Sequence, residues 1–332
     1  MTLQQRIGLM TRLGEYLSSG DEELKEVKNQ AFLHNGWFIP EFVDLALKNI
    51  AEQFLQRKKL EDWIKKYPRL NEKKPGKNVG MVMAGNIPAV GFHDFLCTFM
   101  SGQNMSLKLS SKDEVLSKHF IEKLKAWEPA LNESIQIKEM LKGCDAYIAT
   151  GSNNSARYFH YYFQKYPHII RRNRTSVAVL DGSESEAELK NLSDDVFQYF
   201  GLGCRNITKI YVPERYDFMP LMNIFKRYAF LKDFHRYSNN YDYNLSIVLL
   251  NRTKFMTNDI TLFLENSSAF SPISVLHYEY YKSLEEVGRF LSGNEDIQGV
   301  TGHHHLPFGE AQHPALDDYA DGIDTMKFLS EV

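Results

Sequence analysis

Short apolar runs alternate with amphipathic helical patterns from residue 76 onward, and this alternation limits the fold more than any other feature of the chain. The strand candidates are Asn78–Ala84, Met105–Leu109, Ala146–Thr150, Ser176–Leu180, Ile207–Val212, Ser246–Leu250, Ile273–His277 and Ile297–Thr301. The helical patterns between them include Glu114–Trp127, Asn154–Lys165, Glu186–Phe200 and Phe218–Leu231. Several β runs are apolar almost throughout, as expected for parallel strands covered on both faces. The alternation therefore predicts doubly wound α/β units.

The first 75 residues have a different pattern. Apolar residues recur there at helical spacing, in Leu3–Leu17 and again in Phe42–Phe54. Pro75-Gly76 then interrupts the chain. A second boundary is expected near Gly201–Gly203, where a helix ends in glycines before a new strand, and 332 residues are enough for two domains.

Composition and charge exclude several classes of protein. A net charge of −3 gives no reason to expect a nucleic acid as partner. The most apolar stretch, Val79–Met100, is interrupted by Asn86, Pro88, His93 and Asp94, so we expect no membrane span. The start of the chain is polar, so we expect no signal peptide. The three cysteines are widely spaced and form no Cys-x-x-Cys pair, which fits a reducing compartment. We therefore expect a cytoplasmic protein.

The sharpest candidate for chemistry is Cys204, in the segment Gly201-Leu202-Gly203-Cys204-Arg205. The two glycines would end a helix and let the backbone approach a ligand closely. Cys204, followed by Arg205, could present a thiolate stabilised by positive potential, and its backbone N–H could polarise a carbonyl oxygen. The alternative is a small buried apolar residue, which is how most cysteines behave and what we expect of Cys97 and Cys144.

Asn86 lies in a second candidate segment, Met83–Phe92, where a strand leads into a helix. The carboxyl end of a strand is the usual ligand position in open α/β sheets. The Asn86 amide could donate a hydrogen bond to a developing oxyanion. The alternative is that Asn86 caps the following helix, a common role for asparagine.

A third segment follows the next strand and contains Lys108, Ser110 and Ser111. A lysine with two hydroxyls could bind the ribose and phosphate of a nucleotide. The alternative is a solvated loop in which Asp113 caps the next helix.

Gly151 and Ser152 begin a fourth segment of small and amide residues between a strand and a helix. Such a run could hold a cofactor phosphate at the helix N-terminus. A plain N-cap loop is equally consistent, and the Gly-x-Gly-x-x-Gly and Gly-x-x-x-x-Gly-Lys motifs are absent from the sequence.

In their order and spacing, these four segments together resemble the aldehyde dehydrogenase superfamily. The closest resemblance is to its LuxC-type, fatty aldehyde-forming acyl-CoA reductase family, and it runs from about Gly80 to the C-terminus. The resemblance implies an α/β fold of the aldehyde-dehydrogenase type, with two doubly wound α/β lobes and a helical N-terminal segment. It also implies an NAD(P)-dependent oxidoreductase.

The resemblance assigns roles to the candidate residues. Cys204 matches the catalytic nucleophile, and Asn86 matches the asparagine that shares the oxyanion hole with the backbone N–H of the cysteine. Lys108 matches the lysine that holds the adenosine ribose. Gly151 and Ser152 match the start of the loop beside the cofactor phosphates. Two later stretches also match the family, Phe270-Ser271-Pro272 and Pro307-Phe308-Gly309.

Departures from the family pattern bear on the chemistry. Ser111 stands where NAD-preferring relatives have a ribose-binding glutamate, and Lys112 follows it, so we expect NADPH, with NAD as the alternative. Near Ser268 the family's other glutamate, which binds the nicotinamide ribose, is also missing. Arg171 takes the place of the glutamate that activates water in aldehyde-oxidising members. Without that base, a thioacyl enzyme should exchange with a thiol rather than hydrolyse.

The predicted reaction is the NADPH-dependent reduction of an acyl-CoA, of the fatty type, to an aldehyde through a Cys204 thioacyl-enzyme. Arg171 and Arg174 are candidates for contact with the CoA phosphates, and a homo-oligomer is compatible with the family. One rival enzyme uses an acyl phosphate, or works in the aldehyde-oxidising direction. A rival from another class is a non-catalytic acyl-binding subunit.

The resemblance also divides the chain. We expect a helical segment at 1–75, a cofactor-binding α/β domain at 76–200, a catalytic α/β domain carrying Cys204 at 201–310, and a C-terminal segment at 311–332 that packs back on the body.

The aromatic residues at 158–163 are expected to lie mostly in the core. No metal site is expected at His303-His304-His305, because adjacent histidines cannot all point at one ion from regular structure.

Overall fold

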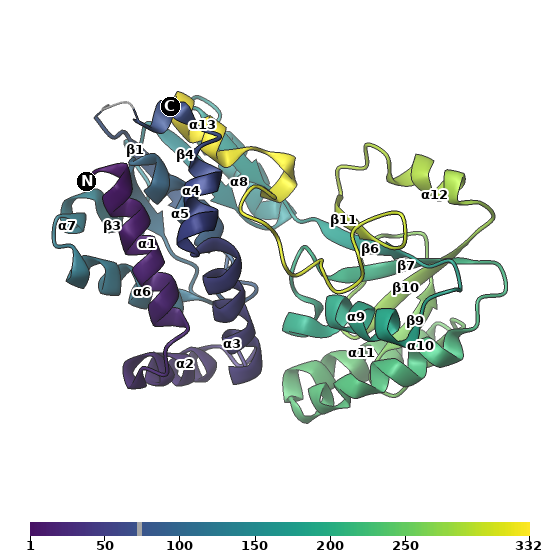
Figure 1. Ribbon diagram of the computed structural model, residues 1–332. Coiled ribbons are helices and arrows are strands. Elements are labelled where there is room, and N and C mark those ends of the chain that lie inside the picture. Colours follow the sequence, from purple (N-terminus) through teal and green to yellow (C-terminus); the bar gives the residue numbers. More distant parts are fainter. Residues whose placement is uncertain (72–74) are drawn as a thin grey trace. The chain divides into compact units, whose positions relative to one another are not determined.

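The computed structural model describes residues 1–71 and 75–332, which form two compact units. Unit 1 comprises Met1–Asn173 and Pro314–Val332, and unit 2 comprises Arg174–His313. Each unit has a largely parallel sheet with helices on both of its faces (Figure 1). The predicted architecture of two doubly wound α/β lobes with a helical N-terminal segment is confirmed.

The sheet of unit 1 has five strands in the order β3-β2-β1-β4-β5, all of them parallel. The strands are β1 (Asn78–Val82), β2 (Asn104–Lys108), β3 (Ile135–Ile137), β4 (Ala146–Thr150) and β5 (His168–Arg171). The chain adds strands outward on one side of β1 and then continues on the other side with β4. This reversal of strand order is the position at which open α/β sheets bind their ligands, outside the carboxyl ends of the strands.

The helices of unit 1 lie on both faces of this sheet (Figure 1). They are α1 (Leu3–Leu17), α2 (Glu22–His34), α3 (Pro40–Asn49), a π-helical turn (Ile50–Phe54), α4 (Arg57–Ile64), a 3-10 turn (Pro68–Asn71), α5 (Phe92–Ser101), α6 (Glu114–Trp127), α7 (Leu131–Ser134), α8 (Asn153–Phe163), a 3-10 turn (Ala320–Gly322) and α13 (Thr325–Glu331). On β4, Ile148 joins the large core with the N-terminal helices, α5, α6 and α13, whereas its neighbours Tyr147 and Ala149 pack with Phe163 of α8. Successive residues of a strand face opposite sides, so β4 alone shows that the sheet is covered on both faces.

Unit 2 has a six-stranded sheet in the order β11-β6-β7-β10-β9-β8, in which β8 is antiparallel to β9 and the other pairs are parallel. Its elements are β6 (Thr175–Val179), α9 (Glu186–Phe197), a 3-10 turn (Gln198–Gly201), β7 (Ile207–Pro213), α10 (Phe218–Phe225), a 3-10 segment (Lys226–Asp233), α11 (His235–Leu250), β8 (Met256–Thr257), β9 (Leu262–Glu265), β10 (Val275–Tyr281), α12 (Leu284–Leu291) and β11 (Ile297–Thr301). Helix α12 covers one face through Val287, and α9, α10 and α11 cover the other (Figure 1).

The segment Ser246–Leu250, predicted as a strand, is the last part of helix α11. The buried residues of this helix, Tyr237, Tyr241 and Val248, share one helical face, while Leu249 and Leu250 are exposed. A short apolar run does not distinguish a strand from the end of a helix, and here the longer helical period decides. The strand predicted at Ile273–His277 is shifted to Val275–Tyr281, and β3, β5, β8 and β9 were not predicted.

The expectation that most of the aromatic residues at 158–163 lie in the core is wrong. Phe163 is buried, but Tyr158, Tyr161 and Tyr162 are 67%, 72% and 65% exposed. Helix α8 packs against the sheet along one face, so the aromatic residues on its other face remain at the surface.

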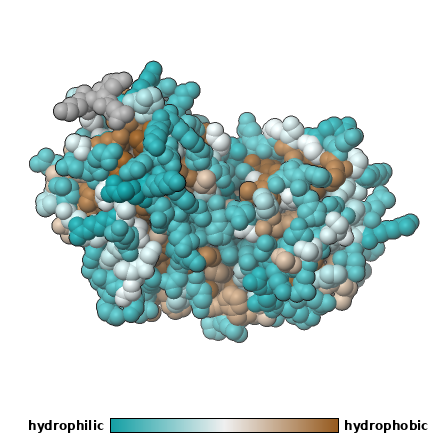
Figure 2. Space-filling view, in the orientation of Figure 1, coloured by the Kyte–Doolittle hydropathy of each residue, from teal (hydrophilic) through white to brown (hydrophobic). Residues whose placement is uncertain are grey.

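In the described part of the chain, no helix is both long enough and apolar enough to cross a bilayer. The face of the molecule in Figure 2 is mostly hydrophilic, with smaller hydrophobic areas between the polar side chains.

The boundary between the units falls after Asn173, before β6. Strand β6 pairs with β7 and β11, so residues 174–200 pack with unit 2. The division into cofactor-binding and catalytic segments concerns function and stays a prediction.

Arg171, at the end of β5, makes a buried ion pair that joins three parts of unit 1. Its Nη2 donates to Asp94 Oδ1 of α5 and to Thr325 Oγ1, both at 2.8 Å, and its Nη1 donates to the Ala320 carbonyl at 2.6 Å. Burial opposes ionisation of Asp94, but the charge and hydrogen bonds of Arg171, together with smaller effects of His93 and Thr325, outweigh it, so the pKa of Asp94 is lowered. The ion pair therefore fastens the C-terminal segment to the sheet.

We predict that Asp94→Ala lowers the free energy of unfolding by about 3–5 kcal/mol, because it leaves a buried guanidinium without its carboxylate. Chemical denaturation measures this loss. Glu114→Ala, which breaks the exposed pair with Lys118, is the control and should cost less than about 1 kcal/mol. Equal losses in the two variants would contradict the role of the buried pair.

Candidate active site

Three of the predicted segments lie at the carboxyl ends of neighbouring strands in unit 1. The Asn86 loop follows β1, Lys108 ends β2, and Gly151 follows β4. Since β2, β1 and β4 are adjacent and parallel, these segments share one edge of the sheet, at the reversal of strand order. The structure thus brings Asn86 together with the residues expected to bind the cofactor.

Asn86 is half-buried in a loop without regular structure between β1 and α5. Helix α5 begins at Phe92 with Gly91 as its N-cap, so the alternative that Asn86 caps this helix is excluded. The start of the loop is fixed by the Met83 N–H, which donates to the Lys108 carbonyl at 3.0 Å. This hydrogen bond continues the β1–β2 pairing by one residue, and Asn86 follows it three residues later in the chain.

Asp113 has a different role from the one weighed in the sequence. It occupies the N-cap position of α6, but its Oδ2 accepts a hydrogen bond from the Ala89 N–H, at 2.9 Å, and none from the backbone of α6. The side chain is buried under the Asn86 loop. Sequence reasoning missed this contact because an aspartate directly before a helix is usually its cap.

The loop after β2 exposes Lys108, Ser111 and Lys112, with Ser110 half-buried beside them. The helical N-terminal segment holds this loop, since the His34 Nε2 hydrogen-bonds to the Ser111 carbonyl at 2.6 Å. Two exposed lysines and an exposed hydroxyl at a strand end fit the ribose and phosphate groups of a nucleotide.

Ser152 caps α8, with its Oγ accepting from the Ser155 N–H at 3.3 Å. A side chain at Gly151 would place Cβ 2.8 Å from Ser155 Cβ and 2.9 Å from the Phe159 ring, so only glycine fits this close approach to α8. A small-residue loop at a helix N-terminus fits a phosphate. The N-cap alternative for this segment is therefore confirmed, and phosphate binding at the same helix N-terminus stays a prediction.

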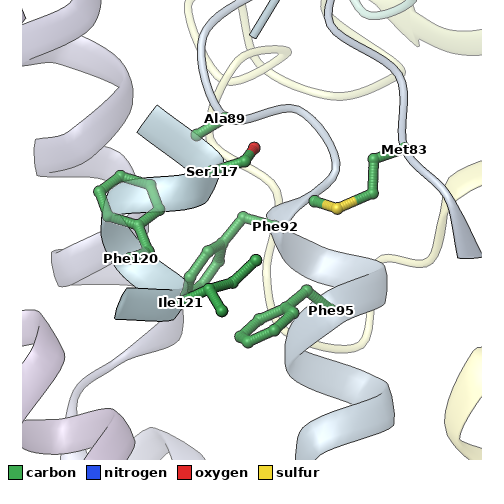
Figure 3. A pocket seen from close by; sticks show the side chains of 7 residues that line it. All are labelled: Met83, Ala89, Phe92, Phe95, Ser117, Phe120 and Ile121. Carbon is green, nitrogen blue, oxygen red and sulfur yellow. The ribbon is translucent and has the colours of Figure 1, made fainter. Parts of the chain in front are cut away.

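A small cavity lies beneath the Asn86 loop, between α5 and α6 (Figure 3). It is lined by Met83, Ala89, Phe92, Phe95, Ser117, Phe120 and Ile121. Its volume of about 10 Å³ is enough for about one water molecule, so it does not hold an acyl chain.

Cys204, in unit 2, lies in a tight turn directly before β7. The buried Asn206 closes this turn, because its Oδ1 accepts from the Gly203 N–H at 2.8 Å. The Asn206 Nδ2 donates to the carbonyls of Asp195 and Gln198, both at 2.9 Å, at the end of α9. One side-chain amide thus fixes the backbone around Cys204 to the end of a helix, a contact that the sequence did not reveal.

The chain enters this turn through three residues with left-handed backbone, Tyr199, Phe200 and Gly201, at φ of 55°, 57° and 73°. This conformation is unfavourable for tyrosine and phenylalanine, and it persists where surrounding packing imposes it. Both aromatic side chains are buried, and Phe200 packs against Tyr237 of α11. The position of Cys204 is therefore held by packing before the turn and by Asn206 after it.

Asp195 ties a further predicted stretch to the same place. Its carboxylate accepts from the N–H groups of Gly309, at 2.7 Å, and Ala311, at 3.2 Å. Burial raises its pKa to about 7, against the opposing effect of these donors. Pro307-Phe308-Gly309 therefore lies beside the end of α9 to which Asn206 is anchored.

Of the three cysteines, Cys97 and Cys144 are buried, and Cys204 is partly exposed. Burial raises the pKa of both Cys97 and Cys144, which disfavours their thiolates. Because Cys204 is partly exposed, the alternative of a fully buried Cys204 is excluded.

A larger cavity in unit 2, of about 320 Å³, lies away from Cys204. It is lined in part by Asp181, which follows β6, and His303, which follows β11, whereas Cys204 precedes β7. Because β6 and β7 are parallel, the cavity lies at the carboxyl ends of the strands and the thiol at their amino ends.

His303 bridges Asp181, at 2.7 Å, and Glu188, at 3.0 Å. No metal-binding group of three or more His, Cys, Asp or Glu residues occurs in residues 1–71 and 75–332.

Solved structures place this fold among the aldehyde dehydrogenases. Aldehyde dehydrogenase 21 from Physcomitrella patens, in complex with succinate, matches with a TM-score of 0.74 at 13% identity, covering 100% of this chain and 84% of that one. Aldehyde dehydrogenase C from Pseudomonas syringae, a cysteine-to-alanine mutant with NAD⁺ and octanal, matches at 0.64 and 13% over 92% and 73%. Betaine aldehyde dehydrogenase from Staphylococcus aureus matches at 0.65 and 9% over 90% and 71%.

A family model for acyl-CoA reductase (LuxC) matches residues 42–218, more than half of the chain. The chain belongs to the LuxC acyl-CoA reductase family and is an NAD(P)-dependent oxidoreductase with an aldehyde-dehydrogenase fold. A comparison with curated proteins finds no match.

We predict that a thiol alkylating reagent modifies Cys204 in the native protein, and Cys97 and Cys144 only after unfolding, because the latter two are buried. Peptide mass spectrometry after brief labelling measures this. In Cys204→Ser, native labelling should vanish. Equal native labelling of all three cysteines would contradict the exposure that the structure assigns.

Proposed function

We propose that this enzyme reduces a fatty acyl-CoA to an aldehyde with NADPH, through a thioacyl intermediate on Cys204. The proposal rests on the family, and above all on the one partly exposed cysteine, held in a turn that Asn206 fixes. A nucleophile needs access and a defined position, and the partial exposure of Cys204 and the turn fixed by Asn206 support this role.

In the first step, Cys204 Sγ attacks the thioester carbonyl. The bond from the acyl carbon to the CoA sulfur then breaks, and CoA leaves with a proton as the free thiol. The oxyanion formed in between would accept hydrogen bonds from the Asn86 amide and the Cys204 N–H. Lys108, Ser110, Ser111, Gly151 and Ser152 would hold the nicotinamide cofactor, which would supply a hydride to the thioacyl carbon. The bond from that carbon to Cys204 Sγ would then break to release the aldehyde, and Sγ would take up a proton to return the thiol.

The preference for NADPH is supported by the loop after β2. Lys108, Ser111 and Lys112 are exposed there, and the nearest following carboxyl, Asp113, is buried and bonded to Ala89. Two cations and no exposed carboxylate between residues 108 and 113 favour a 2′-phosphate over a free 2′-hydroxyl.

Acyl exchange with a thiol is supported by the state of Arg171. This residue stands where oxidising relatives have a general base, and its guanidinium is bound to Asp94. An arginine in this ion pair offers no base to activate water. The same contacts favour a structural role for Arg171 over contact with CoA, and leave Arg174 as the proposed partner of the CoA phosphates.

We further propose a cytoplasmic protein, and its assembly as a homo-oligomer is compatible with the family.

Incubation with a fatty acyl-CoA in the absence of NADPH should add one acyl group to Cys204, as seen by intact mass and peptide mapping. Cys204→Ala should form no adduct. Asn86→Ala should slow acylation by about 100-fold or more, because one oxyanion donor is lost. Acylation at the wild-type rate in either variant would refute its assigned role.

A substrate panel separates the rival functions. Acyl-CoA esters of several chain lengths, an acyl phosphate and an aldehyde are each tested with NADPH or NADP. Faster turnover of acyl phosphate, or of aldehyde oxidation, than of acyl-CoA would reject the proposed substrate. No adduct with any donor and no binding of NADPH would identify a non-catalytic subunit.

The cofactor preference has its own prediction. Ser111→Glu should weaken NADPH binding by about 10-fold or more and favour NADH, because the new carboxylate repels a 2′-phosphate and can accept from a 2′-hydroxyl. Ser111→Gln, of similar size without charge, is the matched control. Unchanged relative Kd values for NADPH and NADH in Ser111→Glu would show that this position does not read the 2′ group.

A further inference from the structure

The Asn86 loop is fixed on both sides of Asn86 by residues 110–113, the segment that leads into α6. After Asn86, the Ala89 N–H donates to Asp113 Oδ2 at 2.9 Å. Before it, Gly85 lies so close to this element that an added Cβ would be 2.6 Å from Ser110 Oγ and 2.9 Å from Asp113 Cβ. Asp113 therefore touches the loop at both Gly85 and Ala89.

Ala89 is held in a strained conformation. Its φ of 54° lies in the left-handed region, which costs a residue with a Cβ about 1–3 kcal/mol. Such a conformation persists only where its surroundings over-determine it. The surroundings here are the hydrogen bond to Asp113 and the wall of the small cavity, where Ala89 lies with Phe92 and Phe120 (Figure 3).

The environment of Asp113 disfavours its anion. The residue is 2% exposed, and its Oδ1 has no hydrogen-bond partner among residues 1–71 and 75–332. Burial raises the pKa of Asp113 well above its usual value, and the Ala89 N–H offsets this in part. Of its two carboxyl oxygens, only Oδ2 has a hydrogen-bond partner in the described part of the chain, the Ala89 N–H.

We propose that Asp113 is a positioning residue for the oxyanion hole, which acts by fixing the Asn86 loop through Ala89 and Gly85. This inference rests on the proposed function of Asn86. An oxyanion donor is effective only when it is held within a few tenths of an ångström of its place, and the loop has no regular structure of its own. The buried carboxyl supplies the fixed point that secondary structure does not.

Two substitutions separate position from fold. Asp113→Asn keeps the size and a carbonyl acceptor for Ala89, so acylation of Cys204 should stay within about threefold of wild type. Asp113→Leu removes the acceptor, and acylation should slow by about 10- to 100-fold, while the Kd for NADPH stays unchanged. Asp113→Ala takes the place of Asp113→Leu if the latter does not fold.

A double-mutant cycle gives the decisive readout. If Asp113 acts through Asn86, then Asp113→Leu should slow acylation no further in an Asn86→Ala background. Asp21→Leu removes a conventional N-cap of α2 in the same unit, and this matched control should lower thermal stability without slowing acylation.

The inference is overturned if Asp113→Leu acylates like wild type, if Asp113→Asn is as slow as Asp113→Leu, or if the losses from Asp113→Leu and Asn86→Ala multiply in full. Each of these results leaves the proposed function intact as long as Asn86→Ala and Cys204→Ala are impaired. Wild-type acylation in those two variants would instead reject the proposed function itself.

Discussion

Parallel strands present all of their carboxyl ends at one edge of a sheet, and the candidate site in unit 1 depends on this constraint. Neighbouring strands β2, β1 and β4 each end in a loop with site residues, and the reversal of strand order between β1 and β4 leaves room there for a ligand. Three segments that are distant in sequence are thus brought to one place by strand pairing alone, as in other open α/β sheets.

Each of the two loops that carry the proposed chemistry is positioned by a buried polar side chain of its own. Asn206 closes the turn of Cys204 and bonds to the end of α9, and Asp113 holds the loop of Asn86 against α6. Left-handed residues other than glycine, Ala89 in one loop and Phe200 in the other, accompany these contacts. A strained backbone conformation persists only where the surrounding contacts hold it. The buried hydrogen bonds of Asp113 and Asn206 are such contacts, and an oxyanion hole and a nucleophile both require a fixed position.

The departures from aldehyde-oxidising relatives are consistent with one chemical direction. In the proposed mechanism Arg171 takes the place of the general base of those relatives. Its guanidinium pairs with Asp94 and bonds to the Ala320 carbonyl, so this arginine fastens the C-terminal segment. The exposed cations after β2 support the proposed preference for a phosphorylated cofactor. Both changes fit acyl transfer between thiols followed by reduction, a route in which water has no role.

The alternation of apolar runs and helical patterns determined the fold class, because burial on both faces of a parallel sheet imposes it on local sequence. The order and spacing of the segments around Asn86, Lys108, Gly151 and Cys204 were enough to identify the family. Local sequence could not distinguish a strand from a helix end at Ser246–Leu250, because so short an apolar run satisfies both periods. Tertiary structure alone decided that Asp113 serves a loop rather than its own helix, that Asn206 fixes the Cys204 turn to the end of α9, and that Arg171 is neutralised by Asp94. Each of these contacts depends on a partner in another element of the fold, and such distances are fixed only when the chain packs.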